Sequence, residues 1–353
     1  MDGTGAVPYM TLLGQSIPGP GVVRRGTAQG PSPTTPQGGT KDLLAVSDLS
    51  GSQIFRLFRI AREIKAAQRS GPASQWLSGL TLGLLFEKPS TRTRVSFEAG
   101  MHQLGGQALF LPSDTIQLSR GESLGDTALV LSRYLDGLVI RTFEQSTLEE
   151  WARYATIPVI NGLTDLCHPC QALADLFTFM EVKESFTEDA FHNLKLAYVG
   201  DGNNVANSLI EAGAKVGMHV AIGCPPEYQP DPGIVERSRE EAGRTGATIK
   251  IVHAPGEAAE NADALYTDVW TSMGQEHEQA ERVKILAPYQ LNERLLGRAK
   301  ASAIVLHCLP AHRGEEITAA VLDGPQSVVL QQAENRLHVQ KAILTEWLGR
   351  PWP

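Results

Sequence analysis

The sequence predicts an α/β protein built from two doubly wound parallel sheets, one in each of two domains. Short apolar runs of strand length alternate with longer segments whose apolar residues recur at helical spacing. This pattern is typical of parallel sheets that helices cover on both faces. The chain has 353 residues, which is enough for two domains of ordinary size. Hydrophobic residues make up 42% of it, so a packed core is expected.

The first series of strands and helices runs from residue 54 to residue 183. Ile54–Arg69 and Ala172–Lys183 have apolar residues at helical spacing, which predicts amphipathic helices. The strands expected between them are Leu80–Phe86, Ala108–Leu111, Gly137–Ile140 and Val159-Ile160, and the further helices are Val95–Leu104 and Asp126–Leu135. Residues 161–165 are expected to form a turn.

The second series begins with the strand Leu194–Val199 and the helix Val205–Lys215. Further strands are expected at His219–Ile222, Thr248–Val252, Ala264–Thr267 and Ala303–Leu306, and Glu334–Leu348 is the closing helix. We therefore expect the domain boundary between residues 180 and 190.

Residues 1–40 differ in composition from the rest of the chain. They are rich in Gly, Pro, Ser and Thr and carry only Asp2, Arg24 and Arg25 as charges, which predicts a flexible leader. The leader lacks the apolar segment of a secretory signal. Its shortage of acids is compatible with an organelle signal, but its many prolines disfavour the amphipathic helix of such a signal.

Charge and cysteine content argue against several classes of protein. The formal net charge of −8 argues against a general nucleic-acid binder, which needs a basic face. No apolar run approaches the roughly 18–20 residues that cross a membrane. Four cysteines are too few for a disulfide scaffold in a chain of this length; they are Cys167, Cys170, Cys224 and Cys308. We therefore expect a reducing compartment, with the cytoplasm as the default.

The segment Ser90-Thr91-Arg92-Thr93-Arg94 lies where a predicted strand passes into a helix. A helix N-terminus presents free N–H groups and the positive end of the helix dipole, which favour an anion. The hydroxyls add donors, and the Arg92 guanidinium matches two phosphate oxygens. The segment predicts a phosphate site, with a plain helix cap beside surface arginines as the alternative.

Further polar candidates follow later strands of the first domain. Arg141 ends an apolar run, either as a solvated strand end or as a cation that binds a ligand. Cys167 and Cys170 have Cys-x-x-Cys spacing, but a zinc site would need two more ligands at suitable spacing, and a redox role is disfavoured as well. His168 and Gln171 can both donate hydrogen bonds to a carbonyl at a helix start.

In the second domain, residues 200–202 (Gly-Asp-Gly) resemble the start of a dinucleotide fingerprint. Val205 stands where the third glycine of that fingerprint belongs, so a tight strand–helix turn is the simpler interpretation. Asn203 and Asn204 could instead hold a carboxylate or an amine.

Three later motifs add charged or reactive groups. Asp268 at a strand end suits an ammonium group, and Ser272 with the loop amides suits a carboxylate, so together they would recognise an amino acid. Cys308 ends another strand, where a thiol is either buried and inert or, beside cations, favoured as the thiolate. Arg336, expected at the start of the last helix, would add a guanidinium to those of the first domain.

Five motifs, in this order, resemble the aspartate/ornithine carbamoyltransferase family, most closely its ornithine-specific members. They are Ser90–Arg94, His168–Gln171, Asp268–Gly274, His307–Pro310 and Glu334–Arg336, and the resemblance covers Asp42 to Leu348. It implies transfer of the carbamoyl group of carbamoyl phosphate to the δ-amine of L-ornithine, which gives L-citrulline and phosphate in arginine metabolism.

The resemblance also implies a role for each part of the chain. Residues 41–183, with the helix 334–349 packed back on them, would bind carbamoyl phosphate, and residues 184–333 would bind ornithine, with the active site in the interdomain cleft. The implied carbamoyl-phosphate ligands are Ser90, Thr91, Arg92, Thr93, Gln117, Arg141, His168, Gln171, Cys308, Leu309 and Arg336. The implied ornithine ligands are Asn204, Asp268, Ser272 and Met273, and the implied catalytic residues are Arg141, His168, Asp268 and Cys308.

This chemistry requires no metal or other cofactor. The family's catalytic unit is a homotrimer, so the expected partners are two small substrates and further copies of the chain. Three alternatives remain open: a carbamoyltransferase for another amine such as putrescine, a catalytically silent binding subunit of this fold, and a nucleotide-dependent oxidoreductase that uses residues 200–202.

Overall fold

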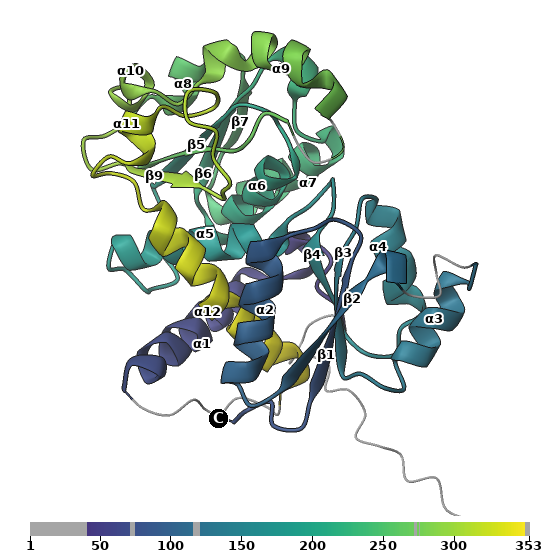
Figure 1. The fold of residues 1–353 in the computed structure, drawn as a ribbon. Helices are drawn as coiled ribbons and strands as arrows, with labels where there is room; N and C mark the ends of the chain where they lie inside the picture. Colours follow the sequence, from purple (N-terminus) through teal and green to yellow (C-terminus); the bar gives the residue numbers. More distant parts are fainter. Residues whose placement is uncertain (1–40, 71–74, 116–120, 272–273, 275, 350–353) are drawn as a thin grey trace, which may run out of the picture. The chain divides into compact units, whose positions relative to one another are not determined.

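The structure, a computed structural model, describes residues 41–70, 75–115, 121–271, 274 and 276–349. The predicted leader, residues 1–40, lies outside the described residues. The described chain forms two parallel sheets with helices around them, which confirms the predicted fold class (Figure 1). Among the described residues, no helix combines the length and apolar character needed to cross a bilayer.

The first sheet has the strand order β2-β1-β3-β4, and all its neighbouring strands are parallel. The strands are β1 (Thr81–Phe86), β2 (Gln107–Pro112), β3 (Gly137–Arg141) and β4 (Val159–Leu163). The helices of this part are α1 (Gly51–Ser70), α2 (Thr91–Gln103), α3 (Leu124–Leu131), α4 (Gln145–Tyr154) and α5 (Pro169–Val182).

The second sheet has the order β7-β6-β5-β8-β9 and is also parallel throughout. Its strands are β5 (Lys195–Val199), β6 (His219–Gly223), β7 (Ile249–Val252), β8 (Ala264–Thr267) and β9 (Ile304–His307). Its helices are α6 (Asn204–Val216), α7 (Pro232–Thr245), α8 (Pro255–Ala259), α9 (Gln279–Leu286), α10 (Glu293–Leu296) and α11 (Ala319–Leu322), and α12 (Val329–Leu348) closes the described chain.

Successive strand residues point to opposite faces of each sheet, so both faces carry apolar side chains. In the first sheet, Leu84 joins the apolar cluster that contains Phe97 of α2. Its neighbour Leu85 joins a different cluster with Trp151 of α4. The second sheet is covered by α6 and α7 on one face and by α8, α10 and α11 on the other. This two-sided burial explains the nearly continuous apolar runs of the predicted strands.

α12 begins at Val329, earlier than the predicted start at Glu334, so Arg336 lies well inside the helix and not at its start. The first turn was missed because its inward side chains are not all apolar: Val329 is buried in an apolar cluster, but Gln332 is a buried amide. α12 contacts α1, α2, α5 and β9.

β4 extends to Leu163, so part of the segment predicted as a turn is a strand. The register of β3 against β4 shifts between Ile140 and Arg141. A Cβ atom on Gly162 would lie only 3.0 Å from Val139 Cγ1 and 3.1 Å from the Ile140 carbonyl oxygen. Glycine therefore permits this close approach at the carboxyl end of β3.

Three helices of the first domain also differ from the prediction. α2 begins at Thr91, before the predicted Val95, because the Ser90 side chain caps it. α3 ends at Leu131, short of the predicted Leu135. α4 was not predicted at all.

Candidate active site

The strand orders place candidate residues at a switch point in each sheet. The chain moves in opposite directions from β1 and β3 in the first sheet, and from β5 and β8 in the second. Ligands of open α/β sheets bind beyond the carboxyl ends of the strands at such points. Ser90 follows β1 and Arg141 ends β3, while Asn204 follows β5 and Asp268 follows β8.

Ser90 is the N-cap of α2. Its hydroxyl oxygen accepts a hydrogen bond from Thr93 N at 3.3 Å, and the two hydroxyl oxygens of Ser90 and Thr93 lie 3.0 Å apart. Thr91 and Arg92 are exposed in the first turn, whereas Thr93 is buried. The helix start therefore combines N–H groups, hydroxyls and a guanidinium, which suits a phosphate.

A neutral histidine lies among three guanidinium groups. Burial lowers the pKa of His168 well below its usual 6.5, and the charges of three arginines lower it further. These are Arg336, Arg141 and Arg92. Burial, followed by the charges of Arg336 and Arg92, also lowers the pKa of Arg141 to about 10, so this guanidinium stays charged at neutral pH.

Two buried nitrogen atoms of this cluster have no partner in the part of the chain that the structure describes. Arg141 Nε and His168 Nδ1 are buried and have no hydrogen-bond partner among the described residues. Nearly all buried polar groups in native proteins are paired, so these two atoms suit a polar ligand. The backbone N–H of His168 donates to Ser208 Oγ at 2.8 Å, which ties the start of α5 to α6.

Arg336 connects two other candidate residues. Its Nη1 donates to Gln171 Oε1 at 2.5 Å, and its Nη2 donates to Thr93 Oγ1 at 3.3 Å. Although Arg336 is not at a helix start, its side chain therefore reaches the cluster that the sequence predicted.

The second half of the site centres on Asp268. Its Oδ2 accepts a hydrogen bond from Asn203 Nδ2 at 2.8 Å. Its Oδ1 accepts from Cys308 Sγ at 2.8 Å and from Val269 N at 2.8 Å. A carboxylate offers about four acceptor positions, so Asp268 can accept one more donor while these bonds stay in place.

Of the two interpretations of Cys308 that the sequence left open, the thiolate is wrong. Burial raises the pKa of the Cys308 thiol well above its usual 9.0, and the neighbouring carboxylate of Asp268 raises it further. The arginine charges do not reverse this shift, and Arg92 only reduces it. The thiol is thus protonated at neutral pH and acts as a donor to Asp268.

Asn204, unlike Asn203, does not bond to Asp268 but to the first domain. Asn204 Nδ2 donates to the Thr164 carbonyl oxygen at 2.6 Å, across to the loop after β4. Arg92 Nη2 donates to the Leu309 carbonyl oxygen at 2.6 Å, which joins the segments after β1 and β9. Leu309 has a φ of 58°, in the left-handed region that branched side chains rarely adopt. Candidates from both sheets therefore meet through direct bonds.

Three predicted site residues cannot be placed. Gln117, Ser272 and Met273 lie outside the described residues.

Sequence reasoning missed an anchor of the Asp268 loop. Arg282 of α9 donates from Nε to the Trp270 carbonyl oxygen at 2.6 Å, and its guanidinium pairs with Asp201. It also stacks over the Tyr228 ring at 4.3 Å. No local pattern signals this anchor, because the paired residues are 81 positions apart.

The same contacts explain residues 200–202 without a nucleotide. A Cβ atom on Gly202 would lie 2.3 Å from Pro230 N, so this glycine makes room for the chain's own backbone. Asp201 is occupied by Arg282. Both features favour the tight-turn interpretation over the dinucleotide fingerprint.

Among the residues that the structure describes, two groups of side chains have spacing compatible with a metal ion, namely Asp268 with His307 and Cys308, and His312 with Glu315 and Glu316. In the first group, His307 Nδ1 accepts from Leu309 N at 2.9 Å, and its Nε2 lies 3.2 Å from Glu316 Oε1. Since Cys308 donates to Asp268, hydrogen bonds within the chain account for this group.

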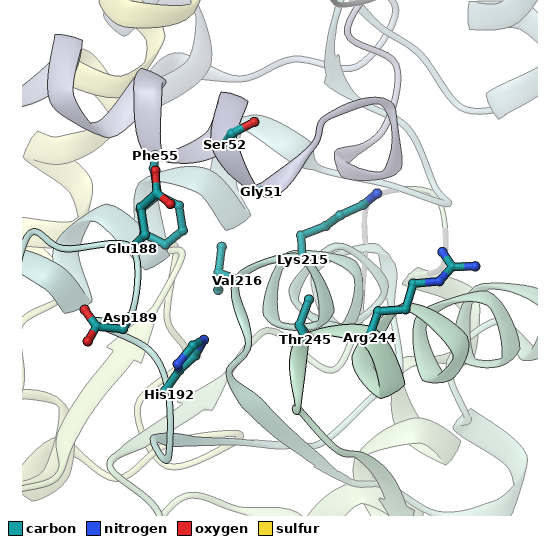
Figure 2. A pocket seen from close by; sticks show the side chains of 10 residues that line it. All are labelled: Gly51, Ser52, Phe55, Glu188, Asp189, His192, Lys215, Val216, Arg244 and Thr245. Atoms are coloured by element: carbon teal, nitrogen blue, oxygen red, sulfur yellow. The ribbon is translucent and has the colours of Figure 1, made fainter.

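A separate pocket of about 400 Å³ lies at the C-terminal ends of α6 and α7 (Figure 2). Its lining residues are Gly51, Ser52, Phe55, Glu188, Asp189, His192, Lys215, Val216, Arg244 and Thr245, and they include none of the candidate site residues. Lys215 and Arg244 each pair with Glu241, at 3.7 and 2.8 Å. The pocket thus lies at the opposite end of α6 from Asn204.

Comparison with known proteins yields two family matches. The description "Aspartate/ornithine carbamoyltransferase, carbamoyl-P binding domain" matches residues 41–181. The description "Aspartate/ornithine carbamoyltransferase, Asp/Orn binding domain" matches residues 192–346.

Individual relatives are similar over most of their length. The chain is 57% identical to ornithine carbamoyltransferase of Syntrophus aciditrophicus over 304 residues, which are 86% of this chain and 98% of the relative. Among solved structures, ornithine carbamoyltransferase from Pyrococcus furiosus has a TM-score of 0.83 at 48% identity and covers 87% of this chain and 96% of its own. The enzyme from Gloeobacter violaceus has a TM-score of 0.78 at 50% identity, with 88% and 99% covered.

Proposed function

The chain belongs to the aspartate/ornithine carbamoyltransferase family, and on that premise we propose that it transfers the carbamoyl group of carbamoyl phosphate to the δ-amine of L-ornithine. The products are L-citrulline and phosphate. One observation carries the proposal: the cationic cluster around the buried His168 adjoins the Asp268–Cys308 pair at the carboxyl edges of two sheets. The first half suits a phosphate and its carbonyl, and the second suits an amino acid.

We assign carbamoyl phosphate to residues 41–183 with α12, and ornithine to residues 184–333. The N-terminus of α2, with Ser90, Thr91 and Arg92, holds the phosphate oxygens. The side-chain oxygen of Gln171 accepts a hydrogen bond from Arg336, and one of its amide hydrogens is donated to Asp175. The second amide hydrogen is therefore available for the carbamoyl group. The bond from Arg92 to Leu309 supports this assignment, because it joins the two halves beside the phosphate position.

The reaction places negative charge on the carbonyl oxygen. The δ-amine nitrogen forms a bond to the carbonyl carbon, the bond from that carbon to the phosphate oxygen breaks, and phosphate leaves with the electron pair. Arg141, His168 and the Thr93 hydroxyl donate to the oxygen that carries the charge. Because its pKa is lowered, His168 acts here as a neutral N–H donor and not as an imidazolium.

The attacking amine must be neutral, although its solution pKa is close to that of lysine, about 10.4. The three arginines around His168 disfavour a positive charge nearby, and so does exclusion of water. Asp268 and the protonated Cys308 thiol orient the ornithine amines through hydrogen bonds. The departing phosphate takes the proton that the amine loses on attack, so no protein thiolate is required.

We further propose that the working unit is a homotrimer. The large apolar side chains that are at least 40% exposed among the described residues all lie in the carbamoyl-phosphate part with α12: Val95, Leu109, Leu129, Val130, Tyr134, Phe143, Tyr154 and Leu330. Such exposure supports contact with further copies of the chain. Light scattering should give a mass three times the 38.1 kDa of one chain, and a monomer mass would contradict the proposal.

The four cysteines are free thiols, which supports the cytoplasm as the location of this protein.

An amine panel tests the proposed function. Purified protein is incubated with carbamoyl phosphate and ornithine, acetylornithine, putrescine or aspartate, and both the carbamoylated product and phosphate are measured. Ornithine should give the highest kcat/KM, with citrulline and phosphate formed in equal amounts. Faster turnover of putrescine, or of another of these amines, would replace the substrate assignment, and phosphate release without product would contradict the reaction.

A further inference from the structure

We propose that Asp175 is a positioning residue for carbamoyl transfer: its carboxylate holds the Gln171 amide in one orientation and, through Gln332, fixes the backbone that carries Cys308. The inference deepens the proposed function and rests on it. Asp175 is not among the implied substrate ligands. It therefore affects the reaction only through Gln171 and Gln332.

The first arm of the arrangement acts on Gln171. Asp175 lies one turn after Gln171 in α5 and is 1% exposed. Its Oδ1 accepts from Gln171 Nε2 at 2.7 Å, while Gln171 Oε1 accepts from Arg336 Nη1 at 2.5 Å. A rotated amide would turn its oxygen toward the carboxylate and its NH₂ toward the guanidinium, so both bonds would be lost. The acid and the guanidinium therefore select a single orientation for Gln171.

The second arm runs through α12 to the second sheet. Gln332 Nε2 donates to the same Asp175 Oδ1 at 2.7 Å and lies 3.2 Å from Tyr266 Oη in β8. Gln332 Oε1 accepts from His307 N at 2.9 Å. His307 is the last residue of β9 and directly precedes Cys308. One carboxylate oxygen thus connects α5, which carries Gln171 and is capped by His168, to the end of β9, which the Cys308 thiol directly follows.

Stability alone does not account for an acid at this position. Burial raises the pKa of Asp175 to about 7, against the lowering effect of the neighbouring Gln171, Gln332 and Tyr266 side chains. Its Oδ2 has no hydrogen-bond partner among the described residues. Apolar side chains at all three positions, 171, 175 and 332, would avoid this desolvation, and replacement of a whole buried polar set in this way is often neutral or stabilising. Alignment of two amides from two different helices gives the acid a role that packing does not.

α5 and α12 offer a matched control. Thr178, one turn after Asp175, is also fully buried, and its hydroxyl accepts from Asn335 Nδ2 at 2.9 Å. The Thr178–Asn335 bond therefore bridges the same two helices, and within the described chain the hydrogen bonds of these two side chains involve neither Gln171 nor Gln332. Thr178→Val removes a buried polar bridge of the same kind, so it reports the effect of helix packing alone.

The experiment compares Asp175→Ala, Asp175→Asn, Gln332→Met and Thr178→Val. For each variant, kcat and both KM values are measured together with the thermal midpoint. Asp175→Ala should lower kcat/KM for carbamoyl phosphate about tenfold or more, because it releases an orienting group. Asp175→Asn keeps an acceptor at the Oδ1 position and should recover most of that loss. Gln332→Met should lower kcat and raise the KM for ornithine more than the KM for carbamoyl phosphate.

The control and a double variant separate positioning from packing. Thr178→Val should lower the thermal midpoint yet leave all three kinetic constants within about twofold of wild type. The double variant Asp175→Ala/Gln332→Met should lose less than the product of the single effects, because both act through one carboxylate oxygen. Equal kinetic losses in Thr178→Val and Asp175→Ala would overturn the proposal. If Asp175→Ala does not fold, unchanged ornithine kinetics in Gln332→Met would overturn it. A wild-type protein without citrulline formation would instead contradict the proposed function.

Discussion

Replacement of Asp268 by asparagine should weaken the use of ornithine far more than the binding of carbamoyl phosphate. An asparagine can keep its oxygen toward the Cys308 thiol and Val269 N, which now donate to Oδ1. Its NH₂ group would then face Asn203 Nδ2, which donates to the second carboxylate oxygen at 2.8 Å. Asn203 cannot turn its amide freely, because its Oδ1 caps α6 by accepting from Val205 N and Ala206 N.

These contacts set the size of the effect. The substitution removes a charged acceptor for an ammonium group, and such hydrogen bonds contribute about 1.5–3 kcal/mol. Since about 1.4 kcal/mol corresponds to a factor of ten, the KM for ornithine should rise about 10- to 150-fold. The dissociation constant of carbamoyl phosphate should change less than about twofold, because the cationic cluster is untouched.

Steady-state kinetics with ornithine and calorimetry with carbamoyl phosphate measure the two effects separately. Asp263→Asn is the matched control, because Asp263 is also a buried acid and directly precedes β8, whereas Asp268 follows it. Asp263 accepts from Lys195 N at 3.0 Å and from Lys300 Nζ at 2.9 Å, away from the site. Equal losses for both substrates in Asp268→Asn, or the same ornithine defect in Asp263→Asn, would refute this placement of Asp268.

Three further substitutions test other parts of the account. Arg92→Ala should raise the KM for carbamoyl phosphate and lower kcat together, because it removes a phosphate ligand and the bond to Leu309; unchanged steady-state kinetics would remove Arg92 from the site. Arg282→Lys should raise the KM for ornithine several-fold with carbamoyl phosphate binding intact, because a lysine has one ammonium group where the guanidinium uses separate nitrogens for the Trp270 carbonyl and Asp201. Calorimetry with each substrate measures this, and equal losses of affinity for both substrates would contradict it. His338→Gln should reduce the acid sensitivity of folding. Burial, with Lys65 and Lys341, lowers the pKa of His338 to about 4, so the unfolded chain binds a proton below about pH 6.5 that the folded chain binds only near pH 4. Wild-type thermal midpoints should therefore fall faster than those of the variant from pH 7 to pH 5, and parallel curves would count against it.

The sequence predicted the parts of the site that follow from the edge of a parallel sheet. Arg141, Asp268 and Cys308 stand at or directly after a strand end, Ser90 follows β1 by a short loop, and the carboxyl ends of parallel strands meet at one edge. Their convergence could therefore be expected from local pattern alone.

Properties that depend on burial were less accessible to sequence reasoning. The thiol of Cys308 was open to either interpretation, since neither its desolvation nor its contact with Asp268 can be read from neighbouring residues. Arg336 was placed at a helix start because buried Gln332 interrupts the apolar spacing of α12.

Long-range polar pairs left no local signal at all. Asp175 and Gln332 are separated by 157 positions, yet one hydrogen bond joins them in the interior. In the sequence, Asp175 is a single acid within the apolar stripe of a helix, and Gln332 is an ordinary amide. Only the packing of α5 against α12 brings them together.

The pH dependence of citrulline formation tests the central claim most directly. The rate is measured with saturating carbamoyl phosphate and a titration of ornithine at several pH values between about 6 and 9. If the neutral δ-amine attacks beside the cationic cluster, kcat/KM for ornithine should rise about tenfold per pH unit at the acidic end, with citrulline and phosphate formed in equal amounts. A value of kcat/KM that does not change with pH, or phosphate release without citrulline, would contradict the account.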